Sequence, residues 1–241
     1  TPLDSRVCEA MEPYLTKRYG NPSSFHSVGK QVKDDLDQTR SQIAKMLGAR
    51  GEEIIFTSGG TESDNLALLG FARKNQDKGK HIITTRIEHH AVLHAAEQLE
   101  KEGFEITYLN VDQDGLVSVE QVMEAIRPDT ILVSIIYANN EAGVVQPVAE
   151  IGNQIEKYRR DNEVEYPVLH TDACQAAGAL EIDVRKIHVD LMTLNGSKSY
   201  GPKGIGLLYK RRGLKVEPLV YGGGQESGLR PGTENVAGAV G

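Results

Sequence analysis

Seven short apolar runs recur along the chain, and each is typical of a buried β-strand. Several are continuous, as expected for strands that are covered on both faces of a sheet. The runs are EIIFTSG (53–59), HIITT (81–85), EITYLNV (105–111), TILVSIIYA (130–138), PVLHTDA (167–173), DLMTL (190–194) and GIGLLYK (204–210).

Segments with helical spacing of apolar residues lie between these runs. The periodic positions Val32, Leu36, Ile43 and Met46 predict a first helix, with Gly48 as its stop. A second helix is expected over 61–74, with Thr61 near its cap. A third is expected through Ala91, Ala95 and Leu99. Alternating strands and helices predict an α/β fold, with a mostly parallel mixed sheet sandwiched by helices. No internal repeat or low-complexity linker divides the chain, and its length allows one large domain, or one domain and part of another.

Composition narrows the class of protein. The chain has 241 residues, of which 39% are hydrophobic and 25% charged, as in ordinary globular proteins. Its net charge of −7 argues against a nucleic-acid partner. Two cysteines, Cys8 and Cys174, form no disulfide framework and no zinc site by themselves, and we predict no metal site. No apolar run is long enough for a membrane span and no leader opens the chain, so we predict a cytoplasmic protein.

In parallel sheets ligands bind beyond the carboxyl ends of the strands, so the residues that follow each run are the candidates. After EIIF, Gly59 and Gly60 precede a helix start near Thr61. This arrangement is either a phosphate cradle or a glycine turn with an ordinary cap. After HIITT, His89 or His90 would present a ring to a planar ligand or act as an acid or base, unless it only caps a helix.

Two further strand ends carry polar side chains. Asn139 and Asn140 follow the fourth run, and they either make a turn or face a carboxylate ligand. Asp172 follows an apolar run that we expect at the centre of the sheet. A buried carboxylate requires a partner, which is either a Lys or Arg side chain or a protonated ring nitrogen.

The segment NGSKSYGPKGIG brings Lys198 and Lys203 to the same edge. It lacks the spacing of a Walker motif, because Ser197 separates Gly196 from Lys198, and it is not a dinucleotide-binding fingerprint. A lysine, a buried acid, a histidine and a phosphate cradle are the parts of a pyridoxal phosphate site. We therefore predict pyridoxal 5'-phosphate as the cofactor.

Seven ordered motifs resemble those of the cysteine desulfurases, enzymes of the class V aminotransferase group with the pyridoxal phosphate type I fold. They are GNPSSFH, FTSGGTESDNLA, EHHAVL, LVSIIYANNEAGVVQ, HTDACQAAG, KSYGPKGIG and GGGQESGLRPGT. The resemblance covers nearly the whole chain. It implies the large cofactor-binding domain over 1–241, with a short segment before it and a small C-terminal domain after it that this chain lacks.

The resemblance also implies a role for each site residue. Lys198 forms the Schiff base with the cofactor, Asp172 pairs with the pyridinium nitrogen, and His89 stacks on the ring and transfers protons. Lys203 is then structural and His90 a bystander. The remaining implied contacts are phosphate binding by Gly60 and Thr61, Gln175 on the phenolic oxygen, Asn140 facing the substrate carboxylate and the cofactor oxygen, and Thr233 as a phosphate ligand lent by a second subunit of a homodimer.

Two departures from the family pattern matter. Where the family has SGHK, this chain has Asn195-Gly196-Ser197-Lys198, so that Asn195 and Ser197 offer an amide and a hydroxyl to the cofactor. The family's nucleophilic cysteine and the arginine that grips the substrate carboxylate lie downstream of Gly241. Neither Cys8 nor Cys174 stands in the nucleophile's place, and Cys174 is expected to be a small packing residue. We therefore expect this chain alone to lack desulfurase turnover.

The implied reaction converts L-cysteine to L-alanine and passes the sulfur on as a protein persulfide. The partner would be a sulfur-acceptor protein, either a scaffold for iron–sulfur cluster assembly or a tRNA-thiolation enzyme, without direct contact with nucleic acid or membrane. Two alternatives stay open at this point. The chain could belong to another class V enzyme, such as a selenocysteine lyase or an aminotransferase, or be a non-catalytic remnant.

Overall fold

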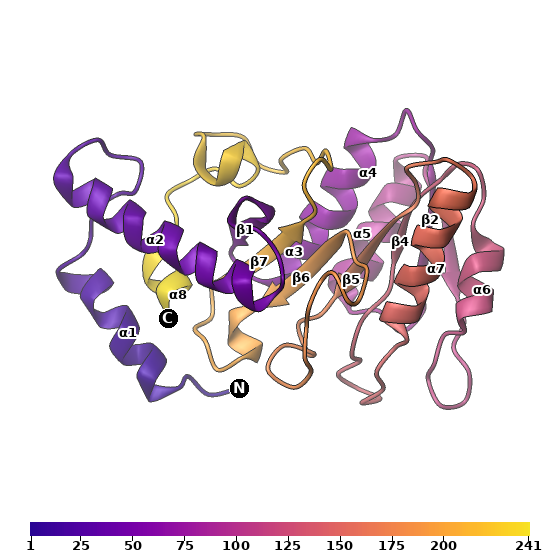
Figure 1. The fold of residues 1–241 in the computed structure, drawn as a ribbon, viewed down its shortest axis with the longest axis horizontal. Coiled ribbons are helices and arrows are strands. Elements are labelled where there is room, and N and C mark those ends of the chain that lie inside the picture. Colours follow the sequence, from indigo (N-terminus) through magenta and orange to yellow (C-terminus); the bar gives the residue numbers. More distant parts are fainter.

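A computed structural model describes all 241 residues, and a seven-stranded sheet runs through its centre (Figure 1). The strand order is β1-β7-β6-β5-β4-β2-β3. Strands β1, β2, β3, β4, β5 and β6 run in one direction, and only β7 is antiparallel to its neighbours. The bounds are β1 Ile54–Thr57, β2 His81–Thr85, β3 Glu105–Leu109, β4 Thr130–Ser134, β5 Val168–Asp172, β6 Leu191–Asn195 and β7 Gly206–Lys210.

Each strand falls inside one of the predicted apolar runs, except that β6 extends one residue past its run to Asn195, so the predicted α/β class with a mostly parallel mixed sheet is confirmed. The fourth strand is shorter than its run and ends at Ser134. The following backbone still bonds to β5, because the Ile135 N–H donates to His170 O and the Tyr137 N–H donates to Asp172 O. This continuation holds the chain before Asn139 beside the end of β5.

Helices cover both faces of the sheet. Their bounds are α1 Ser5–Thr16, α2 Ser27–Met46, α3 Gly60–Asn65, α4 Phe71–Lys74, α5 His90–Lys101, α6 Val119–Ala125, α7 Val148–Asp161 and α8 Val236–Val240. One core cluster of 28 buried residues packs α2, α6, α7 and α8 against one face. A second cluster of 18 packs the α3–α4 segment and α5 against the other. Ile54 and Phe56 of β1 enter the first core and Ile55 the second, as alternation along a strand requires.

Two details of the helices differ from expectation or refine it. The prediction that Met46 belongs to the apolar face of α2 was wrong: its side chain is 79% exposed at the last residue of the helix. Gly48 has φ +70°, a left-handed conformation that glycine adopts without strain, so the predicted helix stop is confirmed. The predicted helix over 61–74 contains a π-helical turn at Leu66–Gly70 between α3 and α4.

None of the helices combines the length and the apolar composition that crossing a membrane requires.

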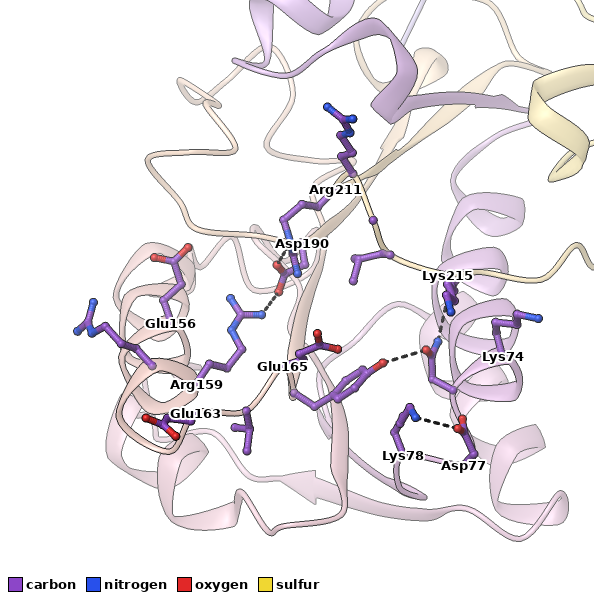
Figure 2. A pocket seen from close by; sticks show the side chains of 17 residues that line it. Lys74, Asp77, Lys78, Glu156, Arg159, Glu163, Glu165, Asp190, Arg211 and Lys215 are labelled. Carbon is purple, nitrogen blue, oxygen red and sulfur yellow. Dashed lines mark hydrogen bonds and ion pairs between the residues drawn. The ribbon is translucent and has the colours of Figure 1, made fainter.

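A polar cavity of about 940 Å³ lies at the amino ends of β2, β5 and β6, opposite the edge with the candidate residues (Figure 2). Asp190 anchors it, with a side chain that is 3% exposed. Its Oδ2 lies 2.8 Å from Arg159 Nη1 and accepts a bond from the Leu169 N–H, while its Oδ1 lies 2.6 Å from Arg211 Nε. The carboxylate therefore joins α7 to strands β5 and β7.

Replacement of this carboxylate is expected to destabilise the protein. Asp190→Ala leaves the Arg159 guanidinium and the Leu169 N–H without their buried partner, at a cost of about 3 kcal/mol in the free energy of unfolding. Urea unfolding monitored by circular dichroism measures the change. Asp77→Ala, which removes an exposed carboxylate at the same cavity, is the control and is expected to change stability by less than about 0.5 kcal/mol. Equal effects of the two variants would contradict the anchoring role of Asp190.

Candidate functional site

The predicted residues follow five strand ends that lie at one edge of the sheet. Strands β1, β2, β4, β5 and β6 are mutually parallel, so their carboxyl ends meet there. The segments that follow carry Gly60, His89, Asn140 and Lys198, and Asp172 is the last residue of β5. The structure thus brings together at one edge groups that are up to 138 residues apart in the sequence, counted from 60 to 198.

Asp172 and His89 are neighbours at the centre of this edge. Asp172 is the last residue of β5 and is buried, and its Oδ1 accepts a bond from the Cys174 N–H at 2.9 Å. His89 caps α5, with Nδ1 accepting from the Ala91 N–H at 3.1 Å. Its ring is nevertheless exposed, and ligand atoms of His89, Asp172 and Asp64 all lie within 4.8 Å of one another. The cap and the ring-presenting function are therefore compatible.

Asp64 is a member of this cluster that the sequence analysis missed. It lies on α3, is 1% exposed, and its Oδ1 has no hydrogen-bond partner. Burial, followed by the charge of Asp172, raises the pKa of Asp64 well above its usual range, which favours the protonated carboxyl. Its position three residues before Ala67 and four before Leu68, both fully buried, was the available signal, because these spacings lie on one helix face.

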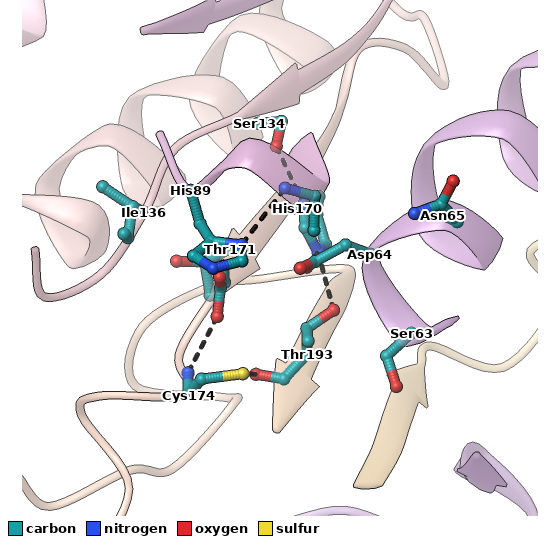
Figure 3. Close-up of polar contacts among 12 residues, drawn as sticks. Ser63, Asp64, Asn65, His89, Ser134, Ile136, His170, Thr171, Cys174 and Thr193 are labelled. Atoms are coloured by element: carbon teal, nitrogen blue, oxygen red, sulfur yellow. Dashed lines mark hydrogen bonds and ion pairs between the residues drawn. The ribbon is translucent and has the colours of Figure 1, made fainter. Parts of the chain in front are cut away.

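A buried histidine completes the polar layer beneath the site (Figure 3). The Nε2 of His170 lies 3.7 Å from Asp64 Oδ1 and 3.1 Å from Thr193 Oγ1, and its Nδ1 contacts Ser134 Oγ at 2.9 Å. Burial lowers the pKa of His170 to about 3, so its ring is neutral. Asp172 forms no ion pair with a Lys or Arg side chain, and the neutral ring of His170 supplies no positive charge to it.

Glu88, next to His89, is a second buried acid that sequence reasoning did not select. Its Oε1 accepts bonds from the Ile136 N–H at 2.9 Å and from Thr85 Oγ1 at 2.7 Å, whereas its Oε2 has no partner. Burial raises the pKa of Glu88 from its ordinary value of 4.5 to about 8. Glu88 is therefore a neutral hydrogen-bonding link between the turns after β2 and β4 at neutral pH.

This protonation predicts a pH dependence of stability. Between pH 4.5 and 8 folded Glu88 keeps a proton that the unfolded chain releases, so rising pH favours unfolding. Glu88→Gln mimics the protonated acid and removes this loss. We expect the stability of the variant relative to the wild type to increase by about 3 kcal/mol from pH 5 to pH 8. Urea unfolding at both pH values measures this; an unchanged difference between the two proteins would show that Glu88 is ionised in the fold.

The phosphate cradle predicted at Gly59 and Gly60 has the expected shape. A Cβ at Gly60 would lie 2.9 Å from Cys174 Sγ and 3.5 Å from the Asn195 Cβ, so no larger residue fits there. No side chain caps the helix that begins at Gly60, and Thr61 is exposed in its first turn. The free N–H groups of this turn and the positive end of the helix favour an anion over an ordinary capped turn.

The lysine segment follows β6. Asn195 caps the 3₁₀ helix η3 (Gly196–Lys198), and its Oδ1 accepts bonds from Ser197 N and Oγ at 3.3 and 3.2 Å. Lys198 is exposed, as is Lys203 on the next turn. Burial and the charge of Asp172 raise the pKa of the Cys174 thiol, and Lys198 partly opposes this. Cys174 is consequently an un-ionised, buried side chain, in agreement with the predicted packing role.

A cavity of about 300 Å³ lies beside His89, which forms part of its wall. Asn140 lines it together with His89 and His90. Asn139 shapes its wall: the buried amide donates to Ile87 O at 2.7 Å and accepts from the Glu141 N–H at 2.8 Å. Asn139 therefore makes the turn, and the neighbouring Asn140 remains exposed for a ligand.

Two predicted residues lie at the margin of this group. Gln175 is half-buried just after Asp172, within the same turn. Thr233 is exposed on a separate loop, 221–233, and no hydrogen bond joins it to the residues of the edge. Within one copy of the chain the structure thus assembles the other candidates without Thr233.

Asp64, His89 and Asp172 offer donors that suit either a divalent cation or a protonated ring nitrogen. The cradle at Gly60 and the lysine after β6 are parts that a phosphorylated aldehyde needs and a metal ion does not. The edge as a whole therefore favours a phosphorylated ring.

Comparison with known proteins agrees with this geometry. The family model described as "Aminotransferase class-V" matches residues 1–241, the entire chain. The chain belongs to this family. Class V aminotransferases are pyridoxal phosphate proteins, so the family and the donor set lead to the same kind of site.

The most similar relatives include cysteine desulfurases. The chain is 53% identical over 241 residues to the putative cysteine desulfurase IscS 1 of Bacillus subtilis, and 49% identical over 236 residues to the mitochondrial cysteine desulfurase of Saccharomyces cerevisiae. The matches cover 100% and 97% of this chain, but 62% and 46% of the two relatives. The chain thus spans about half to two thirds of the length of these class V relatives.

Solved structures show the same likeness. A structure titled "NIFS-LIKE PROTEIN" matches with a TM-score of 0.94 and 40% identity. The match covers 100% of the present chain and 65% of the chain in that structure. A second structure, titled "SspA in complex with cysteine", matches with a TM-score of 0.92 and 43% identity. This match covers 100% of the present chain and 68% of the chain in that structure. These values place the class V chain in the type I fold that its strand order indicates.

Proposed function

We propose that residues 1–241 are the cofactor-binding domain of a pyridoxal phosphate-dependent cysteine desulfurase. The observation that carries this proposal is the meeting of buried Asp172 and the exposed His89 ring within 4.8 Å, at the edge where Lys198 follows the adjacent strand. The similarity to proteins named cysteine desulfurase over the whole chain supports the substrate, L-cysteine.

The residues present fit pyridoxal phosphate. Asp172 uses Oδ1 for the Cys174 N–H and keeps Oδ2 for a protonated ring nitrogen. His89 offers a ring to stack on, and Gln175 a donor for the phenolic oxygen. The first-turn N–H groups of α3 at Gly60 and Thr61 bind the phosphate. The remaining contacts of the proposal are Ser197 and Asn195 on the phosphate side, Asn140 toward the substrate carboxylate, and Thr233 from a second copy of the chain.

When bound, the cofactor supplies an aldehyde that bonds reversibly to amines and a ring that withdraws electrons from the substrate. Lys198 would hold the cofactor through its amine and would take the proton from the substrate Cα. Asp172 would pair with the ring nitrogen and favour its protonated form. His89 lies over the same region and moves a proton at the leaving sulfur.

The net reaction transfers the sulfur of L-cysteine to a protein thiolate and leaves L-alanine. In this proposal the thiolate is neither Cys8 nor Cys174, since Cys174 is buried and its pKa is raised. The persulfide then passes to a sulfur-acceptor protein of iron–sulfur cluster assembly or tRNA thiolation. A homodimer follows from the role of Thr233, and the location is cytoplasmic.

Product analysis of the full-length protein tests the proposal. Incubation with pyridoxal phosphate, a thiol reductant and L-cysteine is expected to release L-alanine and sulfide in equal amounts, above the level of the Lys198→Ala variant. L-selenocysteine and a panel of amino donors with a keto acid acceptor are run in parallel. Turnover of selenocysteine alone, or amino transfer without sulfide, would replace the proposed activity with another one of the family.

A further inference from the structure

The 221–233 loop, drawn in yellow in Figure 1, has an unusual internal support. Glu226 and Ser227 within it have φ of 46° and 57°, the left-handed region that non-glycine residues avoid. The Glu226 side chain is nevertheless buried, with 1% exposed. A strained loop persists only where surrounding contacts fix it, so these contacts specify its shape.

A two-bond ion pair supplies the support. Arg40 Nη1 and Nη2 of α2 lie 2.7 Å from Glu226 Oε2 and Oε1, although the two residues are 186 positions apart. Glu226 Oε2 also accepts the Phe56 N–H at 2.8 Å, and Arg40 Nη1 donates to Ile54 O at 2.8 Å. The guanidinium carbon lies 4.7 Å from the centre of the Phe56 ring. Helix α2, strand β1 and the loop are therefore joined at one buried point.

A second contact ties the same loop to the phosphate cradle. Arg230 Nε donates to Glu62 Oε1 at 3.2 Å, and Glu62 Oε2 accepts the Ser58 N–H at 2.6 Å. Ser58 directly precedes Gly59 in the turn after β1. Inside the loop, Gln225 Oε1 accepts the Gly232 N–H at 3.1 Å. The segment that ends at Thr233 is thus held against the sheet while Thr233 itself faces outward.

We propose that Arg40 and Glu226 are positioning residues that hold Thr233 in place to bind the phosphate of pyridoxal phosphate on a second copy of the chain. The inference rests on the proposed function, which gives Thr233 that contact. A hydroxyl on a free loop would lose most of its binding free energy to the ordering of the loop. The buried ion pair orders the loop before the cofactor arrives.

The test compares the binding of pyridoxal phosphate with that of pyridoxal, which lacks the phosphate, to the full-length protein. Dissociation constants are measured by absorbance titration for the wild type, Glu226→Gln, Thr233→Val and the double variant. Glu226→Gln and Thr233→Val are each expected to weaken pyridoxal phosphate binding about tenfold, the effect of one hydrogen bond to a charged group. Pyridoxal binding stays unchanged, and the double variant is no weaker than either single one.

Two further variants serve as an independent test of the ion pair and as a control. Arg40→Lys keeps the charge but loses the two-bond geometry, and is expected to give the same selective loss even if Glu226→Gln folds poorly. Glu102→Gln breaks a comparable two-bond pair with Arg73, which makes no hydrogen bond to the 221–233 loop, and is expected to leave both ligands unaffected.

Three results would overturn the inference. These are wild-type affinity in Glu226→Gln, an equal loss for both ligands, or additive effects in the double variant. Failure of the wild type itself to bind pyridoxal phosphate would instead overturn the proposed function, and the inference with it.

Discussion

Lys198→Ala is expected to abolish covalent attachment of pyridoxal phosphate and to lower cysteine desulfurase turnover at least about a thousandfold, equivalent to ~4 kcal/mol in the activation barrier. In the proposed site this amine makes the only covalent bond to the cofactor at rest and also removes the substrate proton, so one substitution removes two functions. The variant is expected to fold, because Lys198 is exposed and makes no hydrogen bond through its side chain.

The two readouts are the visible absorption band of the Schiff base between lysine and cofactor, which is expected to be lost, and the rate of alanine formation from L-cysteine. Lys203→Ala is the matched control, since Lys203 is an equally exposed lysine five positions along the same segment. It is expected to keep both the band and the rate. Retention of the band in Lys198→Ala, or its loss in Lys203→Ala, would show that an amine other than Lys198 bonds to the cofactor.

Asp172→Asn is expected to have the second largest effect. The amide keeps the Oδ1 that accepts the Cys174 N–H, so the turn after β5 is preserved while the charge is lost. Loss of a hydrogen bond between charged groups is expected to weaken pyridoxal phosphate binding about 10- to 150-fold. Turnover falls about a thousandfold, because an unprotonated ring withdraws electrons poorly. Equilibrium titration and steady-state rates measure the two effects.

Asp64→Asn is the control for this substitution. Asp64 lies in the same buried cluster, but burial and the charge of Asp172 raise its pKa and favour its protonated form. An amide of the same shape is therefore expected to change binding and rate by less than about threefold, within the range of a conservative replacement. A loss as large as that of Asp172→Asn would show that Asp64 is the ionised partner.

The sequence predicted the sheet well, because each strand has a continuous apolar run that depends on local composition. It also predicted that the polar residues after the strands lie together, because the carboxyl ends of parallel strands meet at one edge of the sheet. The direction of β7 was not specified by its run GIGLLYK, which is compatible with either direction. Met46 was misplaced because periodicity does not tell where the last turn of a helix leaves the core.

The parts that sequence reasoning missed depend on contacts between distant segments. The pairing of Arg40 with Glu226 spans 186 positions and leaves no local pattern. Asp64 and Glu88 were passed over because acidic residues are normally exposed, whereas the packed structure buries both, and burial raises the pKa of each. His89 lies beside Asp172 at the predicted edge, and spacing alone could not show that it both caps a helix and exposes its ring.

The central claim is that Lys198 bonds to a pyridoxal phosphate whose ring nitrogen faces Asp172. Borohydride reduction of the full-length protein with the bound cofactor converts the carbon–nitrogen double bond into a stable amine, and peptide mass mapping then locates the modified lysine. We predict the pyridoxyl phosphate mass on the peptide that contains Lys198, in wild type and in Lys203→Ala alike. Modification of Lys203, or of no lysine in this segment, would contradict the account.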